Sequence, residues 1–188
     1  MRAMGQLEHA KQSAADLYWL VALLTGCQEI AVEMTVQAIG SEGEDRFSTW
    51  MNGWSRRIVI SKALTAIRED LARSARRTEF RRRERPELPP FPWVLHPETT
   101  KAELERALVS IDVFPRAAVL LLIFERMPMN DAANLLNAKP DLLRIAIGAG
   151  LRDLTINLAR MQGRNSGVSK SNSAKGGWQH VCSTRTLS

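Results

Sequence analysis

The sequence of 188 residues has few of the residues from which metal, cofactor and nucleotide sites are built. Its two cysteines, Cys27 and Cys182, lie far apart without a CxxC pair, and its three histidines occur outside any HExxH spacing. Neither a glycine-rich phosphate-binding motif nor a GxSxG motif is found. We therefore expect no metal, no cofactor, no small-molecule substrate and no enzymatic activity.

Long hydrophobic runs are also missing. The run LYWLVALL at residues 17–24 has eight residues, whereas a helix needs about 20 to cross a bilayer. Leu24 to Cys27 (LTGC) resembles a lipoprotein cleavage site, but Asp16 directly precedes the run, and a signal peptide needs a positive segment there. An amphipathic helix that ends at Gly26 fits better, so we expect a cytoplasmic protein without a membrane segment.

Positive charge is in excess, with a formal net charge of +6, but it is unevenly distributed. Residues 1–70 hold seven basic and nine acidic residues, and residues 101–160 hold eight and seven. The excess lies in residues 71–100, with seven basic and four acidic residues, and in residues 161–188, with four basic and no acidic residues. The segments expected to fold are nearly neutral, so basicity alone is weak support for a DNA-reading surface.

Apolar residues recur at three- and four-residue steps, and the alternation typical of strands is absent. This pattern predicts an all-α fold. Gly26 and Gly40 end helices, Thr100 and Glu103 form a capping box, and Pro115 starts a helix in its first turn. The expected helices cover residues 13–25, 29–39, 47–85, 100–110, 115–125, 129–136 and 140–161.

A proline-rich segment divides the chain. Five prolines between residues 86 and 97 exclude a helix or a central strand and predict an extended linker. We expect a helical domain at residues 1–85, the linker at 86–97, a second helical domain at 98–162 and a disordered tail at 163–188. Residues 129–161 have the layout of a helix-turn-helix, which alone is weak evidence because helical proteins often contain such corners.

Both halves resemble one protein family. Residues 20–39 (LVALLTGCQEIAVEMTVQAI) and 47–77 (FSTWMNGWSRRIVISKALTAIREDLARSARR) are similar to region 2 of bacterial RNA polymerase sigma factors of the extracytoplasmic-function type. Residues 113–154 resemble region 4 of the same family, and the proline-rich linker lies where the family has its connector. The resemblance implies a three-helix lobe and a helix-turn-helix lobe in a transcription initiation protein. Its partners would be core RNA polymerase, promoter DNA and an anti-sigma regulator.

The resemblance also implies site residues. Glu29, Glu33 and Gln37 recur four residues apart and correspond to the polymerase-binding face. The implied DNA-binding residues are Trp50, Trp54, Arg56, Arg57, Lys62, Lys139, Arg144 and Arg152. Each has a plainer interpretation: core packing for the tryptophans and a solvated helix face for the basic residues. The arginines from Arg73 to Arg85 fit a phosphate-contacting arm and a solvated helix end about equally well.

Several positions depart from the family pattern. Val36 replaces an amide, Arg57 and Ser61 replace an Asn and an Asp, and the turn at residues 137–139 lacks the usual Gly. In the last helix, Ala146 and Ala149 stand where polar groups are expected, and Gly148 and Gly150 weaken the helix by about 1 kcal/mol each relative to Ala. The alternative hypothesis is therefore a degenerate sigma homologue, a protein-interaction module without sequence-specific DNA binding.

Overall fold

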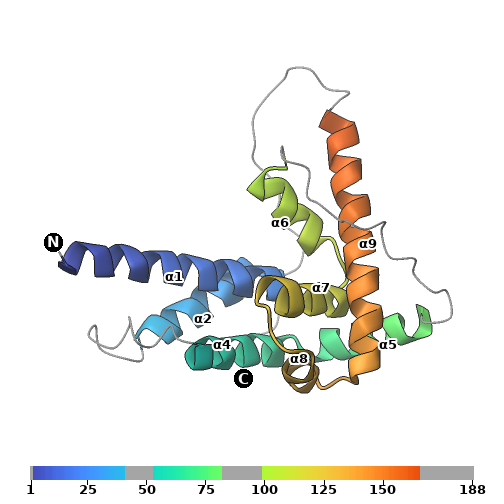
Figure 1. Ribbon diagram of the computed structural model, residues 1–188, viewed down its shortest axis with the longest axis horizontal. Helices are drawn as coiled ribbons and strands as arrows, with labels where there is room; N and C mark the ends of the chain where they lie inside the picture. The colour runs from blue at the N-terminus through green and yellow to red at the C-terminus, as the bar shows by residue number, and fades with distance from the viewer. Residues whose placement is uncertain (1, 41–52, 82–98, 166–188) are drawn as a thin grey trace. The chain divides into compact units, whose positions relative to one another are not determined.

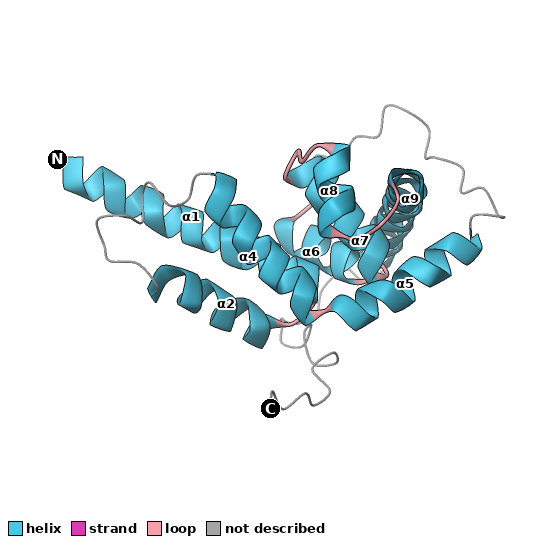
Figure 2. Cartoon of the chain, turned by 90° about the horizontal axis from the view of Figure 1, so that it is seen from below, coloured by secondary structure: helices cyan, strands magenta, loops and turns pink. Residues whose placement is uncertain are grey.

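The computed structural model describes residues 2–40, 53–81 and 99–165 (Figure 1). Every regular element in these ranges is helical, which confirms the expected all-α fold (Figure 2). The α-helices are α1 (Arg2–Thr25), α2 (Gln28–Gly40), α4 (Gly53–Ala66), α5 (Arg68–Arg81), α6 (Lys101–Val109), α7 (Val113–Val119), α8 (Met129–Leu135) and α9 (Pro140–Asn165). A π-helical segment, η3 (Leu120–Phe124), directly follows α7.

The chain divides into two compact units, Met1–Arg68 and Glu69–Ser188. The predicted linker at residues 86–97 and most of the predicted tail lie outside the described residues. The boundary between the units lies after Arg68, the first residue of α5, whereas the sequence analysis placed the residues of α5 in the first domain. The physical reason is that Ser74 and Arg77 of α5 hydrogen-bond to the start of α7, in the second unit.

In the first unit, α1 packs against α2 and α4, and α2 packs against α4. A buried cluster joins the three helices; it contains Leu17, Val21, Ala22, Ala31, Val59 and Ala63. Gly26 separates α1 from α2 with φ 71°, and its N–H donates to the carbonyl of Ala22 at 2.8 Å. Glycine adopts this left-handed conformation without a steric penalty, so the expected helix end at Gly26 is confirmed.

The single long helix expected from residue 47 to residue 85 is wrong. α4 ends at Ala66, Ile67 is in a turn, and α5 begins at Arg68. Glu69 and Asp70 lie in the first turn of α5, where acidic side chains interact favourably with the helix dipole. The apolar spacing continues through this segment without a break, so the sequence analysis missed the start of α5, which these two acidic residues favour.

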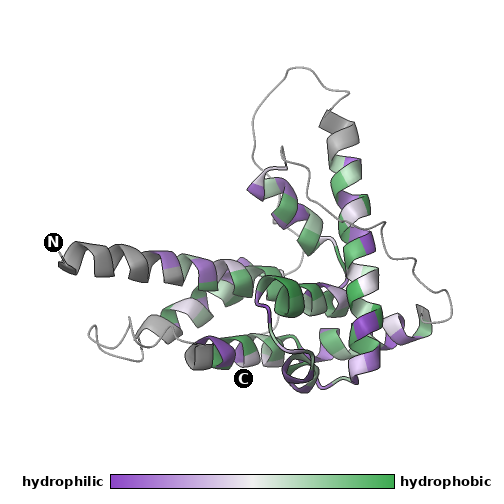
Figure 3. Cartoon of the chain, in the orientation of Figure 1, coloured by the Kyte–Doolittle hydropathy of each residue, from purple (hydrophilic) through white to green (hydrophobic). Residues whose placement is uncertain are grey.

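In the second unit, α7 is mostly apolar (Figure 3), is buried from Phe114 to Val119 and packs against α9. α9 also contacts α6 and α8. Thr100 and Glu103 form the predicted capping box at the start of α6, and Pro115 lies in the first turn of α7 as expected. These local signals placed the starts of both helices to within two residues.

Candidate functional site

The α2 outer face is formed by Glu29, Val32, Glu33, Val36 and Gln37. These residues recur at three- and four-residue steps and therefore share one side of the helix. Val32 is 51% exposed and Val36 is 60% exposed, and the three polar residues are exposed as well. Gln37 Nε2 donates a hydrogen bond to Oε1 of Glu33 at 3.1 Å. An exposed apolar stripe thus lies beside an acidic and amide stripe.

The opposite side of α2 holds this face in place. Ala31 and Thr35 are buried, and Met34 packs against the core of the first unit. The structure therefore brings together the predicted residues Glu29, Glu33 and Gln37. The two valines were missed, because the sequence analysis treated Val36 only as a lost amide. Their four-residue spacing was the signal that could have found them.

The predicted DNA-binding residues of the first unit are only partly described. Trp50 and the side chain of Trp54 lie outside the described residues. Arg56 is half-buried, and Arg57 and Lys62 are exposed on α4. The buried face of the same helix is formed by Val59, Ile60, Ala63 and Leu64. α4 therefore exposes Arg57 and Lys62 to solvent. Both interpretations of these residues, DNA contact and a solvated helix face, require this exposure.

The helix-turn-helix layout is present in α8, a short turn and α9. Asn137 ends α8 with φ 48°. The N–H of Ala138 donates to the carbonyl of Ala133 at 3.0 Å, and the N–H of Asn137 donates to the carbonyl of Asn134 at 3.2 Å. This pair of bonds is a Schellman motif, in which Asn is the usual alternative to Gly. The absence of Gly therefore leaves the turn intact.

The small residues of α9 lie on its buried side, so Ala146 and Ala149 do not occupy exposed positions from which a basic or polar group could reach DNA. Ala146 and Ala149 are buried, as are Gly148 and Gly150. A Cβ atom on Gly150 would lie 2.7 Å from Cγ2 of Val119 and 2.9 Å from the carbonyl oxygen of Pro115. Gly150 therefore permits the close approach of α9 to α7.

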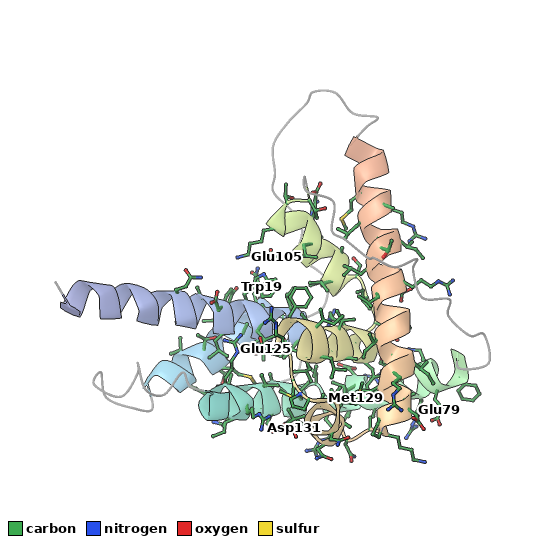
Figure 4. The ribbon with its side chains drawn as sticks, in the orientation of Figure 1. Trp19, Glu79, Glu105, Glu125, Met129 and Asp131 are labelled. Carbon is green, nitrogen blue, oxygen red and sulfur yellow. The ribbon has the colours of Figure 1, made fainter. Side chains whose placement is uncertain are left out.

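The basic residues of this unit are exposed but differ in their surroundings. Lys139, Arg144 and Arg152 are all exposed. Arg144 Nη1 lies 2.5 Å from Oδ1 of Asp141, one turn earlier in α9. At about 100° per residue, Arg144 and Arg152 point about 80° apart around the helix. Asp131 and Met129 lie on the preceding helix α8 (Figure 4).

A polar contact between α5 and α7 was not predicted. Arg77 of α5 donates to both carboxylate oxygens of Asp112, from Nε at 2.9 Å and from Nη2 at 2.7 Å. The N–H of Phe114 donates to Oγ of Ser74 at 2.9 Å. Burial raises the pKa of Asp112, but hydrogen bonds from Arg77, Ser74 and the N–H of Val113 outweigh it and lower that pKa overall. No local signal could indicate this contact, since its residues are 35 and 40 positions apart.

A buried arginine joins α6 to α7. Arg116 is 4% exposed, and its Nη1 donates to the carbonyls of Val109 at 2.7 Å and Ile111 at 3.4 Å. These carbonyls lie at the end of α6 and in the connection that follows. Burial lowers the pKa of Arg116 to about 10, and the nearby Asp112 acts in the opposite direction. Arg116 lies within residues 113–154, which resemble region 4, but the sequence analysis assigned no role to it.

Two further findings concern sites that the described part of the chain could hold. It contains no group of three or more His, Cys, Asp and Glu side chains arranged to bind a metal ion. None of its helices combines the length and the apolar character that a membrane span requires. Comparisons with protein-family models, with curated proteins and with solved structures find nothing that matches this chain.

Proposed function

We propose that this protein is a sigma-like transcription initiation protein that binds core RNA polymerase and promoter DNA in the cytoplasm and catalyses no reaction. The α2 outer face is the observation that carries the proposal. It would bind the polymerase, while α4 and the helix-turn-helix would contact DNA. The resemblance to regions 2 and 4 supplies the assignment, and the geometry of both surfaces supports it.

The α2 outer face suits a protein partner. Complete burial of a valine side chain stabilises a complex by about 1.5–3 kcal/mol, and Val32 and Val36 are still half exposed or more. A partner that covers both would gain roughly 1 kcal/mol from each. Glu29 and Glu33 would favour a partner with basic groups around an apolar strip, because complementary charge steers the association.

The helix-turn-helix suits the major groove. In this motif the N-terminal residues of the second helix contact base edges, and basic groups nearby contact phosphates. Lys139 directly precedes the second helix α9, Arg144 lies in its second turn, and both are exposed. The buried small residues of α9 hold it against α7 and leave this exposed end in place.

The polymerase contact is tested by reversing one charge. Glu33→Lys should weaken binding to core polymerase by about tenfold or more, since like charges across an interface cost several kcal/mol. Asp16→Lys on α1 is a matched control, because Asp16 also accepts a hydrogen bond from a glutamine four residues away, at 2.9 Å from Gln12. Equal affinities of the two variants and the wild type would remove the α2 outer face from the proposal.

A protein-interaction module without DNA binding is the second candidate. The observation that favours it is the ion pair of Arg144 with Asp141, which offsets positive charge where DNA contact is needed. In a DNA titration with core polymerase, Arg144→Ala should flatten the salt dependence by about one counterion. Arg160→Ala is the control, because Arg160 is exposed near the other end of α9. It should leave the salt dependence of DNA binding unchanged. Undetectable wild-type binding to DNA at low salt, together with intact polymerase binding, would favour the second candidate.

A further inference from the structure

Helix α5 contacts the start of α7 through a small and mainly polar surface. Its buried side chains are Leu71, Ser74 and Thr78, which recur at three- and four-residue steps. Only one of the three is a large apolar residue. Thr78 Oγ1 donates to the carbonyl of Ser74 within α5 at 3.0 Å, so it adds no hydrogen bond to another helix.

Ser74 completes the hydrogen bonding at the N-terminus of α7. Val113 N–H donates to Oδ1 of Asp112, and Arg116 N–H donates to the carbonyl of Asp112. Pro115 has no N–H to satisfy. Phe114 is therefore the residue of this first turn whose N–H needs a partner from elsewhere, and Ser74 provides it. Side-chain oxygens at such positions replace the hydrogen bonds that water would otherwise supply.

The ion pair that joins the two helices is open to solvent. The side chain of Arg77 is 55% exposed and that of Asp112 is 24% exposed. Such pairs contribute little in water and are screened by salt. Loss of α5 from α7 would therefore exchange each polar contact for a contact with water, at a small net cost.

We infer that α5 is a releasable segment. The whole helix α5 detaches from α7 in one step, while α6 to α9 remain folded. α5 follows α4 after the single turn residue Ile67. When α5 is docked, the first unit is joined to the second by that short connection. When α5 is released, α5 itself becomes part of that connection, so docking of α5 controls the length of chain that joins the two units. This inference does not depend on polymerase or DNA binding.

Hydrogen exchange of the full chain tests the inference. Amides of α5 should exchange faster than those of α7 and α9, and high salt should accelerate α5 exchange without changing α9. Arg77→Ala should accelerate α5 exchange by about two- to fivefold, the range expected for one exposed ion pair. Arg76→Ala is the matched control, because Arg76 is also exposed on α5 and has no ion pair with any residue that the structure describes.

A charge reversal and a conservative change at Arg77 separate the contact from a general loss of stability. Arg77→Asp should release α5, whereas Arg77→Lys keeps a positive charge opposite Asp112 and should retain part of the protection. Small-angle scattering should show a larger radius of gyration for Arg77→Asp than for Arg76→Asp. The inference is overturned if α5 and α9 amides exchange at one common rate in every variant. An unchanged radius of gyration in Arg77→Asp would also overturn it.

Discussion

Gly150→Ala is expected to destabilise the second unit, although alanine is the better helix former. The new Cβ would lie 2.7 Å from Val119 Cγ2 and 2.9 Å from the Pro115 carbonyl oxygen. The valine can adjust, but the carbonyl belongs to the buried first turn of α7 and cannot rotate away. Overpacking of this kind costs about 1–3 kcal/mol, and the presence of a backbone atom places this case in the upper half of that range.

The gain from helix propensity offsets part of this cost. Replacing Gly by Ala inside a helix is worth about 0.8–1.0 kcal/mol, so the net loss in the free energy of unfolding should be about 1–2 kcal/mol. Ala159→Gly measures the propensity difference in the same helix, because Ala159 is exposed. It should cost about 1 kcal/mol.

Hydrogen exchange of α7 and α9 amides is the suitable assay, since it reports on the second unit alone. A loss of 1–2 kcal/mol corresponds to exchange that is about 5–30 times faster. Exchange that is slower in Gly150→Ala than in the wild type would refute the reasoning. That result would mean that α9 can move away from α7 at no cost.

Three further predictions concern the caps and charges of the second unit. Thr100→Ala should cost about 1 kcal/mol by removing the capping box, and exchange of α6 amides would show it; unchanged exchange would mean that the cap adds nothing. Arg116→Met should cost about 1–3 kcal/mol in urea unfolding, because the carbonyl of Val109 loses its donor; equal stability would contradict this. The pKa of Asp112 is lowered in the folded state, so its stabilising contribution is complete above its unfolded pKa of about 3.9 and is lost as the pH falls through the lower folded value. The wild type should therefore be more stable than Asp112→Asn at neutral pH and lose this difference in the free energy of unfolding in acid. A stability difference that is independent of pH would contradict the contact.

The sequence by itself determined the helical class and several helix ends of this protein, although α1 begins at Arg2 and not at residue 13 as expected. Gly26, the capping box of Thr100 and Glu103, and Pro115 each act within one turn of the backbone. Their effects depend on neighbouring residues that the sequence displays directly. The three polar residues of the α2 outer face were grouped for the same reason, because residues spaced by four lie on one side of any α-helix. The same spacing would have found its two valines, which the sequence analysis missed.

Only the tertiary structure decided the role of α5 and of the small residues in α9. The contacts of Ser74 and Arg77 join residues 40 and 35 positions apart, and no local pattern encodes such a pairing. Ala146 and Ala149 have the same appearance in the sequence whether they replace DNA-contacting residues or fill packing positions. The nearness of α7 shows that they are packing positions, because burial depends on which helix face meets a neighbour, and that is fixed only when the chain has folded.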